Sequence, residues 1–229
     1  MISLSLRLKT IATLVPFGAR VCDVGTDHAY LPIYLKQSGI ASSVLATDLN
    51  QNPLENAQKN ILLSGADGIS LRLCDGLSGV KENEADTIII AGMGGEVITE
   101  ILKNCVWIKN ERVTLILQPT TSAEFLREFL CKNGFAILSE TPVCENGKLY
   151  SVMNVRFKNA PFSHNPAYYY IGEIPHTKDG ILYLKKQQKR VFGCMKALEN
   201  IKEKQNEYLL YKTVFDSIES FLTENADGT

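Results

Sequence analysis

Short apolar segments alternate with helical segments over most of this 229-residue chain, and this alternation strongly limits its possible folds. Seven segments are expected strands: 20–24, 43–49, 69–75, 86–92, 113–119, 135–143 and 148–157. Expected helices lie between the early strands, over 30–39, 52–65, 95–104 and 123–134. Because consecutive strands joined through a helix pair in parallel with a right-handed crossover, the pattern predicts a doubly wound α/β sheet with helices on both faces.

The last two expected strands have no helix between them. Asn146-Gly147 separates them, and this dipeptide is a strong signal for a tight hairpin turn. The sheet should therefore end in an antiparallel pair. That ending is the plan of the seven-stranded methyltransferase sheet, whereas a dinucleotide-binding dehydrogenase half usually keeps its sixth strand parallel. The expected fold is a Rossmann-like class I methyltransferase domain.

The composition changes after Lys158. Residues 159–180 contain three prolines and two glycines, which is typical of a linker. Beyond Gly180, apolar residues step mostly by three and four, as in a coiled coil. This pattern fits one long helix, two antiparallel helices turning near Lys204, which we favour, or helices packed on the main domain. We therefore expect a catalytic domain over 1–158 and a linker with a small helical coiled-coil domain over 159–229.

Composition excludes several classes of protein. A net charge of −1 argues against a diffuse polycationic binder of nucleic acid, so an RNA partner would need a local basic patch. The six cysteines form no CxxC pair and no zinc-site spacing, which predicts reduced thiols and no metal. Residues 1–18 predict an amphipathic helix rather than a signal peptide, and no apolar run is long enough for a membrane span. We expect a cytoplasmic protein.

The loop after the first strand, "DVGTD", holds a single glycine, Gly25, between Asp23 and Asp27. A dinucleotide site needs further glycines there, and two carboxylates would repel a pyrophosphate. S-adenosylmethionine carries an ammonium and a sulfonium but no phosphate, so the two acids favour this cofactor. The alternative is that they only cap the following helix or fix the loop.

Two further acids stand at the ends of the next strands. Asp48 closes the second strand, near the interval at which an acid takes ribose hydroxyls, and Asp75 ends the third, where it can accept a hydrogen bond from an adenine amino group. Because the carboxyl ends of parallel strands meet at one edge, these acids and Asp23 should face a common crevice. Together they predict a site for S-adenosylmethionine.

The fourth strand ends in Ala91-Gly92-Met93-Gly94-Gly95, where exocyclic-amino methyltransferases carry [DN]PP[YF]. No strong base is available there. The glycines can simply form a tight turn with positive φ that opens the next helix. They also leave the backbone free to approach a flat base, which suits a ring nitrogen that attacks with its own lone pair.

Several motifs together resemble one family. They are "LSLRL", "DVGTDHAYLPIYL", "ATDLNQNPLENA", "RLCDGL", "ADTIIIAGMGG", "LILQP" and "LREFLCKNGFAI". The chain resembles the TrmK family of bacterial tRNA adenine-N1 methyltransferases, which act on A22 in the D-arm region, from about Leu4 to Arg156. The resemblance implies a class I domain that uses S-adenosylmethionine and a C-terminal coiled-coil domain. Thr120 stands where methionine often follows Gln-Pro in the family, which leaves the shape of the base pocket open.

The resemblance also implies roles for individual residues. We expect the cofactor to contact Arg7, Asp23, Gly25, Asp27, His28, Asp48, Leu49, Asp75, Gly76, Ala91 and Gly92. Arg7 would reach the cofactor carboxylate or a tRNA phosphate. His28 has the alternative of a plain hydrogen bond to the backbone.

The resemblance places the target at adenine N1, which must leave its stack before it can react. The expected catalytic set is Asp27, Tyr30, Met93, Gly94 and Gln118. Asp27 and the carbonyls of the 92–94 turn would stabilise the positive charge of the methylated base, and Tyr30 would stack on it. Residues 91–95 and Gln118-Pro119 would border the reacting centre.

Four basic residues, Lys185, Lys186, Lys189 and Arg190, follow one another without an acid. They are candidates for a clamp on tRNA phosphates, or they form an ordinary solvated helix face. Two other functions stay open: a methyltransferase for a small molecule, which would usually carry a lid over its pocket, and a non-catalytic RNA- or protein-binding module, which would be expected to lose the crevice acids. We expect a monomer that binds tRNA.

Overall fold

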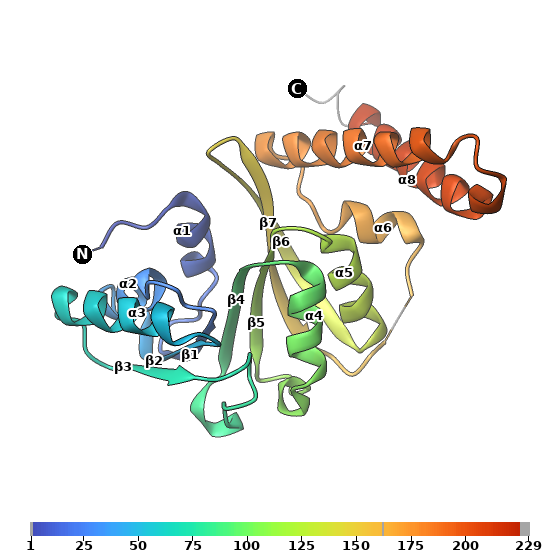
Figure 1. Ribbon diagram of the computed structural model, residues 1–229. Coiled ribbons are helices and arrows are strands. Elements are labelled where there is room, and N and C mark those ends of the chain that lie inside the picture. The colour runs from blue at the N-terminus through green and yellow to red at the C-terminus, as the bar shows by residue number, and fades with distance from the viewer. Residues whose placement is uncertain (1, 162, 225–229) are drawn as a thin grey trace.

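Seven strands form one sheet in the order β3-β2-β1-β4-β5-β7-β6 in the computed structural model, which describes residues 2–161 and 163–224 (Figure 1). The strands are β1 (Ala19–Val24), β2 (Ala41–Asp48), β3 (Ile69–Leu73), β4 (Thr87–Met93), β5 (Thr114–Pro119), β6 (Phe135–Glu145) and β7 (Lys148–Phe157). All seven expected strands are present. The doubly wound seven-stranded fold is confirmed.

The first five strands pair in parallel, whereas β7 pairs antiparallel with both β5 and β6. The turn between β6 and β7 contains Asn146 at φ 50° and Gly147 at φ 72°. Positive φ at both central residues is the geometry of a type I′ turn, which matches the twist of a hairpin. The expected hairpin at Asn146-Gly147 is confirmed.

Helices cover both faces of the sheet, as the alternation predicted. The helices of this part are α1 (Leu6–Thr13), α2 (Tyr30–Gln37), α3 (Gln51–Ser64), α4 (Gly95–Lys103) and α5 (Ala123–Lys132). Ile88 and Ile90 pack with α4 and α5, while Ile89 between them packs with α1 and α2 on the other face. Successive side chains of a strand point to opposite faces, so a strand buried on both sides is apolar throughout.

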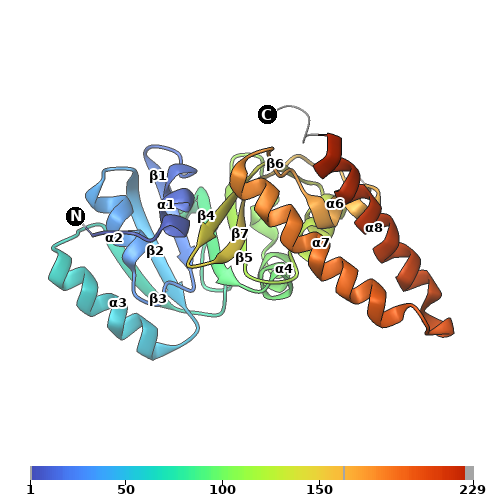
Figure 2. The ribbon, with the colours of Figure 1, turned by 90° about the horizontal axis from the view of Figure 1, so that it is seen from above.

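Three helices follow the sheet: α6 (Pro166–Ile171), α7 (Lys178–Leu198) and α8 (Gln205–Glu224). Figures 1 and 2 show α7 and α8 side by side at the end of the molecule remote from α3, which confirms the helical hairpin. Leu184 and Val191 of α7 pack against Val214 and Ile218 of α8. The sequence interpretation missed α6, which lies inside the expected linker, and the domain boundary at 158 stays a prediction.

A buried ion pair joins the sheet to the C-terminal helices. Arg127 of α5 bonds both oxygens of Glu140 of β6 at 2.8 Å and also donates to the carbonyl of Tyr169 and the hydroxyl of Tyr183. Burial alone would lower the pKa of Arg127, but the adjacent Glu140 raises it above its usual value. Burial likewise opposes ionisation of Glu140, yet Arg127 lowers the pKa of this carboxyl. Both groups are therefore charged.

Replacing Arg127 by methionine should lower the free energy of unfolding by about 3–5 kcal/mol, because it leaves the Glu140 carboxylate buried without its partner. The double variant Arg127→Met, Glu140→Leu should recover part of this loss. Urea unfolding followed by circular dichroism measures both values. A single variant as stable as the parent protein would contradict this role of the pair.

Candidate functional site

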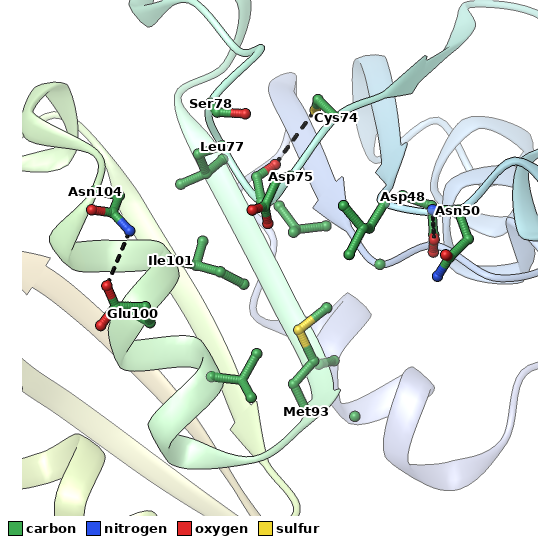
Figure 3. A pocket seen from close by; sticks show the side chains of 17 residues that line it. Asp48, Asn50, Cys74, Asp75, Leu77, Ser78, Met93, Glu100, Ile101 and Asn104 are labelled. Carbon is green, nitrogen blue, oxygen red and sulfur yellow. Dashed lines mark hydrogen bonds between the residues drawn. The ribbon is translucent and has the colours of Figure 1, made fainter.

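A cavity of about 630 Å³ lies at the carboxyl ends of β1 to β4. Strand order reverses between β1 and β4, and crevices at such reversals bind ligands in doubly wound sheets. Figure 3 shows Asp48 and Asn50 on one side of the cavity, Glu100 and Ile101 of α4 with Asn104 at its end on the other, and Asp75 between them. Its volume lies within the usual range for small-molecule sites.

Eight residues expected from the sequence line this cavity. They are Gly25, Asp48, Leu49, Asp75, Gly76, Ala91, Gly92 and Met93. The other expected residues of the reacting centre and cofactor site lie outside the lining: Arg7, Asp23, Asp27, His28, Tyr30, Gly94 and Gln118. The structure thus brings together residues at the ends of four strands, β1 to β4, and leaves the second group outside the cavity lining.

The cavity is acidic. Asp48, Asp75 and Glu100 line it, and none of the described residues in its lining is Lys, Arg or His. Asp48 accepts a hydrogen bond from the backbone of Asn50 at 2.9 Å through one oxygen. A site of this charge favours a cationic ligand over a phosphate. The three carboxylates of the cavity therefore fit the positively charged S-adenosylmethionine, as the sequence predicted.

Asp23 lies near the end of β1, outside the cavity lining, and is only 7% exposed. Its carboxylate accepts a hydrogen bond from the Thr26 hydroxyl at 2.8 Å, and it forms no ion pair with a base among residues 2–161 and 163–224. Burial raises the pKa of Asp23 to about 6, although the Thr26 bond opposes this shift. A buried acid without a cation is a place where a ligand cation would be stabilised.

Gly25 lies next to Met93 and adopts a backbone conformation that favours glycine. Its φ of 77° lies in the left-handed region, and a Cβ at this position would collide with the end of the Met93 side chain. Met93 in turn comes from β4, the neighbour of β1 in the sheet. Gly25 and Met93, at the ends of neighbouring strands, both line the cavity.

Gln118 holds the turn at the end of β4. The side chain of Gln118 is fully buried, and its oxygen accepts from the Gly92 amide at 3.1 Å and from Arg7 Nη1 at 2.6 Å. The Arg7 amide donates to Glu145 at 2.9 Å, and its guanidinium lies over the ring of Tyr150. Both Arg7 and Gln118 are thus bound within the protein, at the edge of the reacting centre expected from the sequence.

Asp27, His28 and Tyr30 form an exposed group at the start of α2. His28 lies 3.4 Å from the Asp27 carboxylate and stacks on Tyr30 with ring centroids 5.2 Å apart. Its carbonyl, rather than its ring, accepts a hydrogen bond from Asn60. The group presents an acid and an aromatic face to solvent, next to Gly25 in the chain.

Gly94 and Gly95 lie at the start of α4, next to the loop that follows β5. The Thr120 amide donates to the Met93 carbonyl, and the Gly95 amide donates to the Thr121 carbonyl, both at 2.8 Å. A Cβ on Gly95 would collide with the carbonyl of Ser122. The close approach of these two loops explains the glycine at position 95 without reference to a ligand.

The four basic residues of α7 lie beside two different cavities, and their contact with tRNA stays a prediction. Lys186 and Arg190 line a second cavity beside the loop after β5, whereas Lys185 and Lys189 lie against Phe215 and Glu219 of α8. A helix turns about 100° per residue, so the two pairs occupy adjacent faces. The expected clamp therefore divides into two pairs with different surroundings.

Sequence reasoning missed part of the cavity wall. The missed side chains include Asn50, Cys74, Val97, Glu100, Ile101 and Asn104. Four of these belong to α4 and the residue that ends it, at positions 97, 100, 101 and 104, which share one face of a helix. That spacing, directly after a turn expected at the reacting centre, was the signal that could have found them.

Neither a metal-binding group of side chains nor a membrane-spanning helix is found in the described part of the chain. Within residues 2–161 and 163–224, no three His, Cys, Asp or Glu side chains are grouped so that they could hold a metal ion. No helix in these ranges has the length and apolar character needed to cross a membrane.

Replacing Asp23 by asparagine should stabilise the free protein near neutral pH. The folded-state pKa of Asp23 is above the unfolded value, so its ionisation opposes folding as the pH rises through about 6. The variant should gain up to ~3 kcal/mol of unfolding free energy at about pH 7.5 and roughly half of that at about pH 5.

Urea unfolding of the parent protein and the variant at both pH values measures this difference. Asp27→Asn is the matched control, because Asp27 is an exposed acid in the same loop, and it should change stability by less than about 0.5 kcal/mol. A gain that does not depend on pH would exclude Asp23 as its electrostatic cause.

The chain is similar to known methyltransferases in sequence and in structure. The sequence model described as "Methyltransferase domain" matches residues 4–153. The chain is 40% identical over 153 residues to the tRNA (adenine(22)-N(1))-methyltransferase of Bacillus subtilis (strain 168). This alignment covers 66% of the chain and 64% of the relative, so it spans slightly less than two thirds of that protein.

Similar solved structures cover almost the whole chain. The crystal structure of the B. subtilis M1A22 tRNA methyltransferase TrmK aligns with a TM-score of 0.85 at 27% identity, over 97% of this chain and all of that one. M. capricolum TrmK, in complex with S-adenosyl-homocysteine, aligns with a TM-score of 0.78 at 30% identity, over 96% of this chain and 98% of the other. The similarity therefore includes the C-terminal helices.

Proposed function

We propose that this chain, which belongs to the TrmK family of methyltransferases, transfers a methyl group from S-adenosylmethionine to N1 of adenine 22 in the D-arm region of tRNA. The observation that carries this proposal is the similarity to TrmK structures over both the sheet and the C-terminal helices. The acidic cavity at the strand ends supports the choice of donor. The protein would act in the cytoplasm as a monomer.

The residues of the cavity fit the donor. Asp23 would hold the positively charged methionine end, Asp48 the ribose hydroxyls and Asp75 the adenine amino group. Leu49, with its side chain exposed at the cavity, would cover the adenosine part. S-adenosylmethionine supplies the methyl group from its sulfonium centre when bound.

The target nitrogen needs no strong base, because adenine N1 has a lone pair in the plane of the ring. Asp27 and the carbonyls of the 92–94 turn would stabilise the positive charge that the methylated base acquires. Gln118 and Arg7 would act by fixing the Gly92 turn, since their own polar groups are already bonded there. Tyr30 would stack on the extruded base beside His28.

The C-terminal helices would bind the body of the tRNA. Lys185, Lys186, Lys189 and Arg190 of α7 are the proposed contacts, since phosphate contacts position an RNA substrate. The helical hairpin also argues against a small-molecule substrate, because it lies at the end of the molecule remote from α3 (Figure 2) and none of its described residues lines the first cavity as a lid would.

Incubating the purified chain with unmodified tRNA and labelled S-adenosylmethionine should give 1-methyladenosine on nucleoside analysis. A tRNA transcript with guanosine at position 22 should receive no label, because guanine N1 carries a hydrogen and lacks the free in-plane lone pair with which adenine N1 attacks. Labelling of a small molecule but not of tRNA would favour the alternative substrate class. Binding of tRNA without any transfer would instead favour a non-catalytic module.

Affinity for S-adenosylhomocysteine should fall as the pH drops below about 6, because Asp23 must be ionised to hold the ammonium group. Calorimetry should show binding about tenfold weaker at about pH 5 than at about pH 7. The Asp23→Asn variant should bind weakly at both pH values, without this slope. A parent protein whose affinity is constant over the range would remove Asp23 from this role.

A further inference from the structure

A second cavity of about 290 Å³ lies between the loop after β5 and helix α7. Its floor is the loop 119–124, one wall is Tyr150 and Ser151 of β7, and the other wall is formed by Lys186 and Arg190. The two halves of the protein, sheet and C-terminal helices, thus both contribute to it. The volume is at the lower end of the range for small-molecule sites.

This cavity adjoins the acidic one. Met93 pairs with Pro119 in the sheet, and the Thr120 amide donates to the Met93 carbonyl at 2.8 Å. Met93 lines the first cavity, while Pro119 and Thr120 line the second. A ligand group seated in the second cavity would therefore be separated from the reacting centre by a single layer of backbone.

The second cavity has the opposite charge from the first. Lys186 and Arg190 are one helical turn apart on α7 and face the cavity together. Arg190 forms an ion pair with Glu124, with 2.8 Å between Nη1 and the carboxylate oxygen, and this pair compensates the charge of Arg190. Lys186 donates to the backbone carbonyl of Leu149 at 3.2 Å and forms no ion pair within the described ranges, so its charge is uncompensated.

Neutral donors and an aromatic ring complete the lining. The hydroxyls of Thr120 and Thr121 have no hydrogen-bond partner in the part of the chain that the structure describes. Tyr150 adds a ring whose neighbour is Arg7, the residue bonded to Gln118. A cation, free hydroxyls and an aromatic ring are the groups that bind a ribose phosphate.

We propose that the second cavity binds the ribose phosphate of a nucleotide adjacent to the target adenine. This inference rests on the proposed function, because an adenine drawn out of its stack carries the neighbouring backbone toward the enzyme. Lys186 pairs with the phosphate, Thr120 and Thr121 donate to its oxygens or to the ribose, and Tyr150 packs on the sugar or base. Of the four basic residues of α7, Lys186 therefore makes the contact closest to the reaction.

Binding of tRNA at several salt concentrations tests the assignment. The slope of log affinity against log salt reports the number of phosphates that a protein neutralises. Lys186→Ala should weaken binding by about fivefold near 0.1 M salt and reduce the slope by roughly one phosphate contact. Lys196→Ala is the matched control, since Lys196 lies on the same helix outside both cavities, and it should leave the slope unchanged.

A second variant should act in the opposite direction. Glu124→Gln removes the acid that compensates Arg190, so it should tighten tRNA binding and increase the salt slope. Loss of folding could not produce tighter binding. Calorimetry with S-adenosylhomocysteine should give the parent affinity for all three variants, because none of these residues lines the first cavity.

Two results separate this inference from the proposed function. If the parent protein forms 1-methyladenosine but Lys186→Ala and Lys196→Ala have the same salt slope, the second cavity does not bind phosphate. If the parent protein forms no 1-methyladenosine but the slopes of the variants differ as expected, the cavity binds RNA and the proposed reaction is wrong.

Discussion

The inner parallel strands β1, β2, β4 and β5 are largely buried, and they leave polar side chains one common place to gather, the edge where the strands end. Ile88, Ile89 and Ile90 show the constraint most clearly, because each is fully buried although they point to alternate faces. An acid in the middle of such a strand would lose its hydration without gaining a partner. The burial of the sheet thus determines that charged groups such as Asp48 and Asp75 meet around one cavity.

Much of this arrangement could be predicted from the sequence. Runs such as 88–91, Ile-Ile-Ile-Ala, are apolar at every position, which is the signature of a strand buried on both faces. The turn Asn146-Gly147 identified the antiparallel end of the sheet, since both of its residues adopt positive φ. Acids at strand ends could be located because the topology of parallel strands brings their carboxyl ends together.

The remaining features depend on distances that a linear pattern does not contain. Asp23, Asp48 and Asp75 look alike in the sequence, yet Asp23 is buried outside the cavity lining and the other two line the cavity. The wall contributed by α4 depends on how that helix leans over the strand ends. Likewise, the basic residues of α7 look alike in the sequence, yet two of them line a cavity beside β7 and the other two line a cavity beside α8.

The contact between Arg7 and Glu145 joins residues 138 positions apart, and Arg7 also bonds Gln118 beside the Gly92 turn. A ribosome makes the chain from its N-terminus, so the first helix leaves the exit tunnel long before the hairpin that receives it. The turn at the reacting centre acquires its final support only after residue 145 has emerged. A nascent chain shorter than this contains the acids of the cavity but lacks the contact between Arg7 and Glu145. The site therefore reaches its final shape only when the whole sheet has been made.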